Sequence, residues 1–168
     1  MNDICNELHF DNRVIPTFIN REESFWKVFL KNTKQSPSNI AVTDNQKKIS
    51  YQEMFDLVSK VSNYFQKLNL VKKDRICVLF ENSWPLIVYI LAGLKNGVIV
   101  VPLNPRSSKF ENELVINDCR ASYIFSDKEL KNNLPHSDEL KSVVDILYFD
   151  EFKLNNLEVN KSEKRWPI

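Results

Sequence analysis

The chain has 168 residues, and its 23 lysines and arginines nearly balance 22 aspartates and glutamates, which leaves a net charge of +1. This even balance argues against nucleic acid or an anionic membrane surface as a partner. Leucine, isoleucine, valine and phenylalanine make up a third of the sequence, which excludes a disordered chain and predicts a globular domain.

The first predicted helix follows a leader. Residues 1–19 show no clear pattern, and we expect them to be an unstructured leader without a signal peptide. Asn20 and Glu23 have the spacing of a helix cap, which predicts a helix from Asn20 to Ser36. Short apolar runs on either side of Asp44-Asn45 then predict a β-hairpin within residues 40–49.

The clearest element in the sequence is the next helix. Ser50-Tyr-Gln-Glu53 is a complete capping box, and apolar residues then recur at steps of three and four as far as Leu68. Asn69 suits the left-handed position that ends a helix. We therefore expect an amphipathic helix over residues 51–68.

Strands and helices alternate from Arg75 to Phe149. The expected strands are 75–80, 98–103, 121–125 and 145–149, and the expected helices are 83–96, 108–118, 126–135 and 137–141. Residues 98–103 show no polar alternation, so we expect this strand to be buried on both faces. The pattern predicts an α/β fold, a mostly parallel sheet of βαβ units with flanking helices.

The most apolar stretch, Trp84–Leu103, does not have the pattern of a membrane span. Lys95-Asn96-Gly97 interrupts it, and a spanning helix needs about 20 consecutive apolar residues. A buried helix, a turn and a strand explain it better. We expect no membrane span and a cytoplasmic protein.

Glycine is rare, since only Gly93 and Gly97 occur. Phosphate-binding loops need several glycines, because backbone N–H groups must approach the phosphate closely. Composition therefore excludes the common nucleotide-binding loops from this chain. The three cysteines, Cys5, Cys77 and Cys119, form no CxxC pair, so we expect reduced thiols, with neither a zinc site nor a disulfide framework.

The ionisable side chains form no evident catalytic set. His9 and His136 lie in predicted loops without a partner that the sequence can identify, and we expect both at the surface. Asp74 and Arg75 open a strand and are typical of solvated turn charges. We assign no catalytic, cofactor-binding or metal-binding residue in this chain.

Two polar segments remain ambiguous. Asn82-Ser83 and Asn104-Pro105-Arg106 each follow a predicted strand, at the edge where open α/β sheets bind ligands. A helix cap is the simpler interpretation of the first segment, and the second is similarly ambiguous between a structural and a binding role.

Four separated segments resemble one enzyme family. Ile49–Met54 resembles the first core motif of adenylate-forming (AMP-binding) enzymes, and Leu94–Asn104 resembles their second. Between these, Asp74–Ile76 and Asn82–Leu94 resemble a strand start and the helix that follows it. The four segments occur in the family's order and spacing, and the resemblance covers residues 37–149.

The resemblance implies a fold and a chemistry. The fold would be the N-terminal subdomain of the adenylate-forming enzymes, in incomplete form. Family members use ATP and Mg²⁺ to convert a carboxylic acid to an acyl-adenylate, and then pass the acyl group to a thiol such as coenzyme A. The turn at Pro102–Arg106 resembles acyl-CoA and aryl-CoA ligases more than peptide-synthetase adenylation domains, which usually have aspartate there.

The departures from the family are as informative. Asn69 and Lys73 stand where glycines are usual, and Asn96 replaces an alanine. The phosphate loop and the later motifs of the family, including its catalytic lysine, have no counterpart in these 168 residues. We therefore predict that the chain alone is inactive and that ATP, Mg²⁺ and coenzyme A belong to a full-length relative.

Three hypotheses follow for the organisation of the chain. In the first, residues 20–149 are a partial AMP-binding subdomain, residues 150–168 are a polar loop or truncated end, and the chain is a scaffold fragment of an acyl-CoA-ligase-like enzyme. Its partner would be the remainder of the ligase fold, or a second copy at an exposed sheet edge. The alternatives are a free-standing α/β binding module and a small flavodoxin-like domain.

Overall fold

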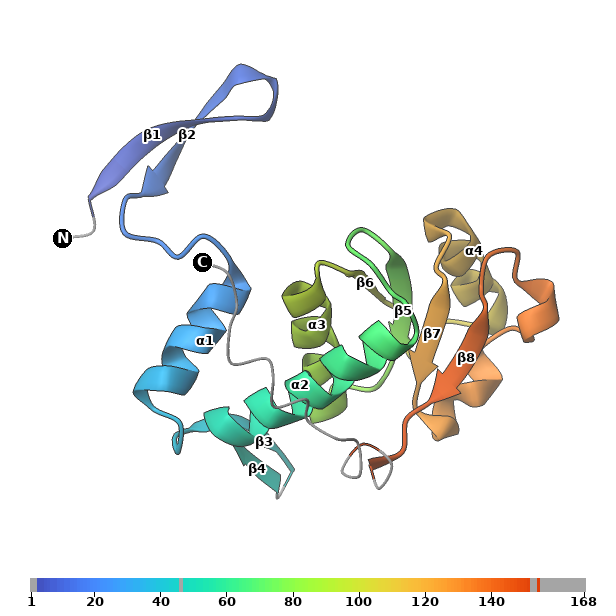
Figure 1. The fold of residues 1–168 in the computed structure, drawn as a ribbon. Helices are drawn as coiled ribbons and strands as arrows, with labels where there is room; N and C mark the ends of the chain where they lie inside the picture. Colours follow the sequence, from blue (N-terminus) through green and yellow to red (C-terminus); the bar gives the residue numbers. More distant parts are fainter. Residues whose placement is uncertain (1–2, 46, 152–153, 155–168) are drawn as a thin grey trace.

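The computed structural model describes residues 3–45, 47–151 and 154 (Figure 1). The α-helices are α1 (Phe25–Gln35), α2 (Tyr51–Lys67), α3 (Trp84–Asn96) and α4 (Lys109–Cys119). The strands are β1 (Ile4–His9), β2 (Arg13–Phe18), β3 (Ile40–Asp44), β4 (Lys47–Ser50), β5 (Arg75–Leu79), β6 (Ile99–Pro102), β7 (Tyr123–Ser126) and β8 (Asp145–Tyr148). Three short 3₁₀ helices, η1 (Phe10–Asn12), η2 (Lys128–Asn133) and η3 (Ser137–Glu139), complete the described elements.

The central feature is a four-stranded sheet with the order β6-β5-β7-β8, in which every neighbouring pair is parallel. Helix α3 joins β5 to β6, and α4 joins β6 to β7. These are the predicted βαβ units, so the expectation of an α/β fold with a parallel sheet is confirmed. The chain places β6 on one side of β5 and then crosses to place β7 on the other side. The order in which strands are added therefore reverses between β5 and β7.

The two faces of the sheet are covered by different helices (Figure 1). Strand β5 shows this by alternation, because Ile76 and Val78 join the core formed with α1, α2 and α3. Cys77 and Leu79 point to the opposite side, where they pack with residues of α4. All four side chains are fully buried. Both sides of the central strand therefore lie in hydrophobic core, as in doubly wound sheets.

Strand β6 differs from the expectation of a strand buried on both faces. Ile99 is 44% exposed, and only the flanking residues Val98 and Leu103 are buried. The reason is topological, because β6 is the outermost strand among the described residues, with β5 on one side only. An apolar run alone cannot distinguish a central strand from an edge strand whose outer side is open.

Local sequence signals fix the ends of most helices. In α2, the Glu53 backbone N–H donates to Ser50 Oγ over 3.2 Å, and the Ser50 N–H donates to Glu53 Oε2 over 2.7 Å, which is the predicted capping box. Ser108 and Glu111 repeat this arrangement at α4. Gly97 and Asn69 adopt the predicted left-handed backbone, with φ of 70° and 58°. These features are confirmed.

Helix α1 begins later than expected. Its N-cap is Ser24, whose Oγ accepts from the Lys27 N–H over 3.2 Å, and not Asn20. Asn and Ser both cap helices well, so residue type alone does not exclude Asn20, and the predicted start was wrong by four residues. The helices expected at 126–135 and 137–141 are the shorter 3₁₀ helices η2 and η3.

The expected unstructured leader contains a β-hairpin. Strands β1 and β2 pair in antiparallel register over their full length, and the hairpin projects from the body of the molecule (Figure 1). The turn between them contains Asp11 and Asn12, both left-handed with φ of 58° and 59°. Asp and Asn tolerate this backbone better than other side chains do, so this dipeptide was the overlooked hairpin signal.

Candidate functional site

Open α/β sheets bind ligands beyond the carboxyl ends of their strands, at the point where the strand order reverses. In this sheet that point lies between β5 and β7. The residues that follow these two strands are Glu81-Asn82-Ser83 and Asp127. We therefore take this edge, together with the loop after β6, as the candidate site.

The loop after β5 leads directly into α3. Asn82 is exposed, and the Ser83 hydroxyl donates to the Glu81 carbonyl over 3.1 Å, so Ser83 gives no side-chain cap. Instead Asp44 Oδ2 accepts from the Trp84 backbone N–H over 2.9 Å. A carboxylate of the β3–β4 hairpin thus meets the positive end of the α3 dipole, where a bound anion would otherwise lie.

The loop after β6 is held as a turn. Asn104 Oδ1 accepts from the Arg106 backbone N–H over 2.9 Å. The Asn133 amide donates to the carbonyls of Pro105 and Ser107, over 3.2 and 2.9 Å. These bonds account for Asn104 as a turn residue, and the exposed Arg106 side chain is the group of this segment that can approach a ligand.

Asp127, which the sequence suggested only as part of a helix start, is the carboxylate at the end of β7. Burial raises the pKa of its side chain to about 6, and the negative charges of Glu129 and Glu81 contribute to this rise. An acid with a pKa in this range can exchange protons near neutral pH. No local sequence signal marks this residue, because its environment depends on β5 and β7 being neighbours.

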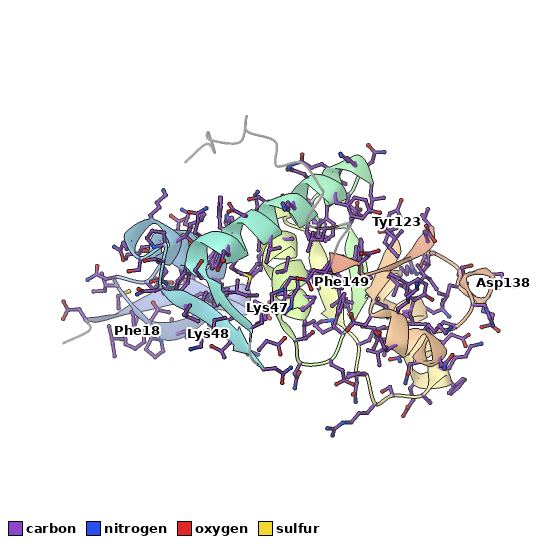
Figure 2. All side chains as sticks on the ribbon, turned by 90° about the horizontal axis from the view of Figure 1, so that it is seen from below. Phe18, Lys47, Lys48, Tyr123, Asp138 and Phe149 are labelled. Carbon is purple, nitrogen blue, oxygen red and sulfur yellow. The ribbon has the colours of Figure 1, made fainter. Side chains whose placement is uncertain are left out.

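Aromatic side chains that follow β5 and β8 pack together at this edge. Phe149 packs edge-on against Trp84 and Phe80, with ring centroids 5.6 and 6.0 Å apart. Lys47 Nζ lies 4.1 Å from the centroid of the Trp84 ring, and it also pairs with Glu151. Lys47 and Phe149 are labelled in Figure 2. Residues from the β3–β4 hairpin and from the end of β8 are thereby joined to the start of α3.

The remaining charged candidates of the sequence do not join this edge by any described contact. His9 Nε2 lies 3.3 Å from Glu7 Oε2 within the N-terminal hairpin, but it makes no hydrogen bond there. His136 is exposed, and its backbone N–H donates to Glu139. Asp74 Oδ2 accepts from the Val71 N–H over 2.8 Å and so closes the turn before β5.

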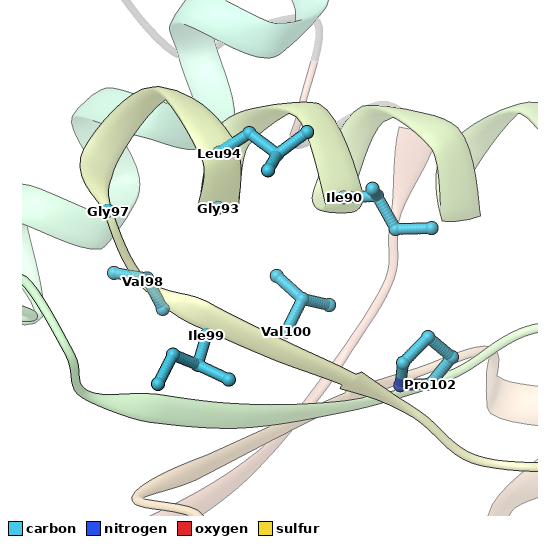
Figure 3. A pocket seen from close by; sticks show the side chains of 8 residues that line it. All are labelled: Ile90, Gly93, Leu94, Gly97, Val98, Ile99, Val100 and Pro102. Carbon is cyan, nitrogen blue, oxygen red and sulfur yellow. The ribbon is translucent and has the colours of Figure 1, made fainter. Parts of the chain in front are cut away.

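A separate apolar pocket of about 440 Å³ lies between α3 and β6 (Figure 3). Ile90, Leu94, Val100 and Pro102 contribute to its wall, and none of its lining residues has a polar side chain. Such a lining can contact apolar groups, but it offers no side chain for acid–base or metal chemistry.

Within the described residues, no group of three or more His, Cys, Asp or Glu side chains is placed to hold a metal ion. In the same part of the chain, no helix is long and apolar enough to cross a membrane. The edge thus provides a titratable carboxylate, an exposed arginine and an aromatic cluster, whereas Asp44 and Asn104 are engaged in a helix cap and a turn.

Comparison with known proteins identifies the family. The family model described as "AMP-binding enzyme" matches residues 29–167. The chain belongs to the AMP-binding enzyme family. The resemblance inferred from the core motifs is therefore confirmed.

Curated relatives include large synthases. The chain is 26% identical over 154 residues to a plipastatin synthase of Bacillus subtilis, a match that covers 90% of this chain and 6% of the synthase. It is 23% identical over 134 residues to gramicidin S synthase 1 of Brevibacillus brevis, covering 80% of this chain and 12% of that protein. The chain therefore spans only a small part of the relatives it matches.

Solved structures share the fold. Klebsiella oxytoca NpsA, in complex with 3-hydroxyanthranilyl-AMSN, matches with a TM-score of 0.72 at 23% identity over 88% of this chain and 28% of its own. Mycobacterium tuberculosis fatty acyl CoA synthetase matches with a TM-score of 0.75 at 17% identity, over 84% and 30%. The predicted N-terminal subdomain of the adenylate-forming fold is confirmed.

The family's core motifs can be located in the structure of this chain. Ile49–Met54 forms the end of β4 and the capped first turn of α2, where Ile49 and Met54 are buried. Leu94–Asn104 forms the end of α3, the left-handed turn at Gly97 and strand β6. Both motifs therefore define where helices and strands begin and end.

Proposed function

We propose that this chain is the N-terminal scaffold of an enzyme that activates a carboxylic acid with ATP as an acyl-adenylate. The observation that carries the proposal is the family match over residues 29–167, together with a fold shared with the solved relatives. In this function the described residues form half of a sheet, and the carboxyl edge after β5 and β7 faces the bound nucleotide or acid.

The proposal assigns the phosphate chemistry to residues outside this chain. Only two glycines occur in the 168 residues, and both lie at the α3–β6 junction, where they serve helix packing and a turn. Phosphate binding by backbone N–H groups therefore needs a loop from the remainder of the fold. We propose that the chain alone neither binds ATP productively nor activates acids, and that it acts in the cytoplasm.

The acceptor thiol separates two forms of the proposal. The turn at Asn104 favours an acyl-CoA ligase, whereas the fold is shared both with a fatty acyl CoA synthetase and with NpsA. The names of the curated relatives, plipastatin and gramicidin S synthases, favour a peptide-synthase adenylation domain that would load a carrier such as the PCP of the fused NpsA-ThdA protein. We propose coenzyme A as acceptor, with carrier loading as the competing outcome.

The test is a chimera in which residues 29–149 replace the equivalent segment of Klebsiella oxytoca NpsA. ATP–pyrophosphate exchange is measured with a panel of aryl and fatty acids, for the chimera and for the 168-residue chain alone. We expect acid-dependent exchange from the chimera and background exchange from the isolated chain. A chimera that melts cooperatively yet shows no exchange contradicts the scaffold role and favours a free-standing binding module.

The acceptor is tested separately. Thioester formation is measured with coenzyme A in one arm and a PCP carrier in the other. A chimera inherits acceptor contacts from NpsA, so the informative comparison is this protein joined to its own remaining segments. Thioester formed only on the carrier overturns the acyl-CoA form while leaving acid activation intact.

A further inference from the structure

Two of the three cysteines lie in contact. Cys77 belongs to the central strand β5, and Cys119 is the last residue of α4. Their Sγ atoms are 3.6 Å apart, although 42 positions separate them in the sequence. This is van der Waals contact between two free thiols, produced by α4 packing on the sheet.

The two thiols differ in access. Cys77 is fully buried among apolar residues that include Leu79, Ile116 and Ile124. Cys119 is only partly buried, and its Sγ also lies 3.4 Å from the Ile116 carbonyl oxygen. A reagent in solution therefore reaches Cys119 first, and the thiol in contact with an oxidised Cys119 sulfur is that of Cys77.

We propose that Cys77 and Cys119 are a reversible redox pair that forms an intramolecular disulfide when the protein meets a peroxide. Peroxide oxidises the Cys119 thiolate to a sulfenic acid, and its second oxygen leaves as water or hydroxide. The Cys77 sulfur then attacks the sulfenic sulfur, which forms the S–S bond and releases the sulfenic oxygen as water. The two thiols together lose two protons and two electrons, and one hydrogen peroxide becomes two waters.

The two sulfur atoms already lie close to bonding distance. An S–S bond is about 2.05 Å long, so the sulfurs must approach by about 1.5 Å. Cys119 closes the last turn of α4, just before Arg120 in the left-handed conformation with φ of 53°. Terminal helical turns shift more readily than a central strand, so the movement falls on Cys119 and not on Cys77.

The local electrostatics predict slow oxidation that accelerates with pH. Burial raises the pKa of the Cys77 thiol, and the nearby Cys119 sulfur adds to this effect. The thiolate is the reactive form of cysteine, so we expect the disulfide to form only under sustained oxidation. Its formation should be slower at pH 7 than at pH 9.

A metal site is the competing use of two adjacent thiols. The described residues place no further His, Asp, Glu or Cys beside this pair to complete a metal-binding group. Cys5 provides an internal comparison, because its sulfur lies near Thr17 and Glu7 in the N-terminal hairpin, and no contact with another thiol is described for it.

The test is oxidation of the full chain at low protein concentration with hydrogen peroxide, followed by alkylation and peptide mapping without reductant. We expect one linked peptide pair that contains Cys77 and Cys119, alkylated Cys5, and return of all three thiols with dithiothreitol. The rate should rise at least about threefold from pH 7 to pH 9, because the thiolate fraction grows, and the oxidised chain should melt at a higher temperature.

Matched variants make the result decisive. Cys5→Ser should leave the linked pair unchanged, whereas Cys119→Ser and Cys77→Ala should abolish it, together with the increase in melting temperature. Cys119→Ser changes a partly buried residue at a helix end, so it serves even if Cys77→Ala fails to fold. Links that involve Cys5, links between chains, or alkylatable Cys119 without any link after prolonged oxidation each overturn the proposal.

Discussion

Helix α3 and strand β6 approach each other closely at Gly93. A Cβ atom at this position would lie 2.2 Å from Val100 Cγ2 and 3.1 Å from the Val98 carbonyl oxygen (Figure 3). Ordinary contacts begin near 3.4 Å, so α3 and β6 would have to separate by about 1 Å or Val100 would have to leave its position. Gly93→Ala therefore tests whether α3 packs on β6 as described.

The expected magnitude combines two opposing effects. Overpacking a close contact costs about 1–3 kcal/mol, and the very short contact places Gly93→Ala near the upper end of that range. Alanine in a helix interior returns about 1 kcal/mol relative to glycine. We expect a net loss of about 2 kcal/mol in the free energy of unfolding. Val100→Ala removes the obstructing methyl groups, so the double variant should recover most of the loss through a coupling of about 1–2 kcal/mol.

The measurement is urea denaturation of the four proteins of this double-mutant cycle, followed by the fluorescence of the core residues Trp26 and Trp84. Gly93→Ala with Val100 intact should shift the midpoint downward without changing the slope. A neutral or stabilising Gly93→Ala would refute the close approach of α3 to β6. Strict additivity in the double variant would refute Val100 as the obstructing side chain.

Three further predictions concern turns and charge. Gly97→Val should lower the free energy of unfolding by about 1–3 kcal/mol in urea melts, because φ is +70° and the new Cβ would meet Lys72 Cγ at 2.9 Å. Lys73→Gly should instead raise it by about 0.5 kcal/mol, since Lys73 has φ of 77°, and Lys72→Gly is the control that should not be stabilising. Asp127 has a folded-state pKa raised to about 6 from 3.8, so the folded state retains its proton more tightly and stability should fall from pH 4 to pH 6. In melts across this range, Asp127→Asn should flatten that fall by less than about 1 kcal/mol, because the group is partly screened by solvent.

Features with a local physical cause could be predicted from the sequence. The capping box at Ser50 and Glu53 needs only one turn of backbone to form, and Gly97 ends α3 because it tolerates a positive φ. These helix starts and ends alternate with apolar runs that predict strands, which indicates βαβ units. Because βαβ crossovers are right-handed, few sheet orders are possible. The parallel sheet followed from these local elements.

Features that depend on distant segments could not be predicted. Lys95 lies in the last turn of α3, a usual position for an exposed lysine, yet it is only 8% exposed and its Nζ lies 3.4 Å from Ser59 Oγ of α2. The N-cap of α3 is similar, because the Asp44 carboxylate that accepts from the Trp84 N–H lies 40 residues away in the sequence. Nothing in the neighbouring sequence encodes which strand or helix will lie alongside.

The charges at the carboxyl edge of the sheet support the proposal that this chain is a scaffold and that other residues bind the phosphates. Asp44 already meets the positive end of α3, and Glu81, Asp127 and Glu129 add negative charge where β5 and β7 end. A bare triphosphate would be repelled by these groups, whereas a nucleotide whose charge is neutralised by Mg²⁺ or by a lysine from the remainder of the fold would not. This edge is therefore better suited to face the rim of a nucleotide site than to hold its phosphates.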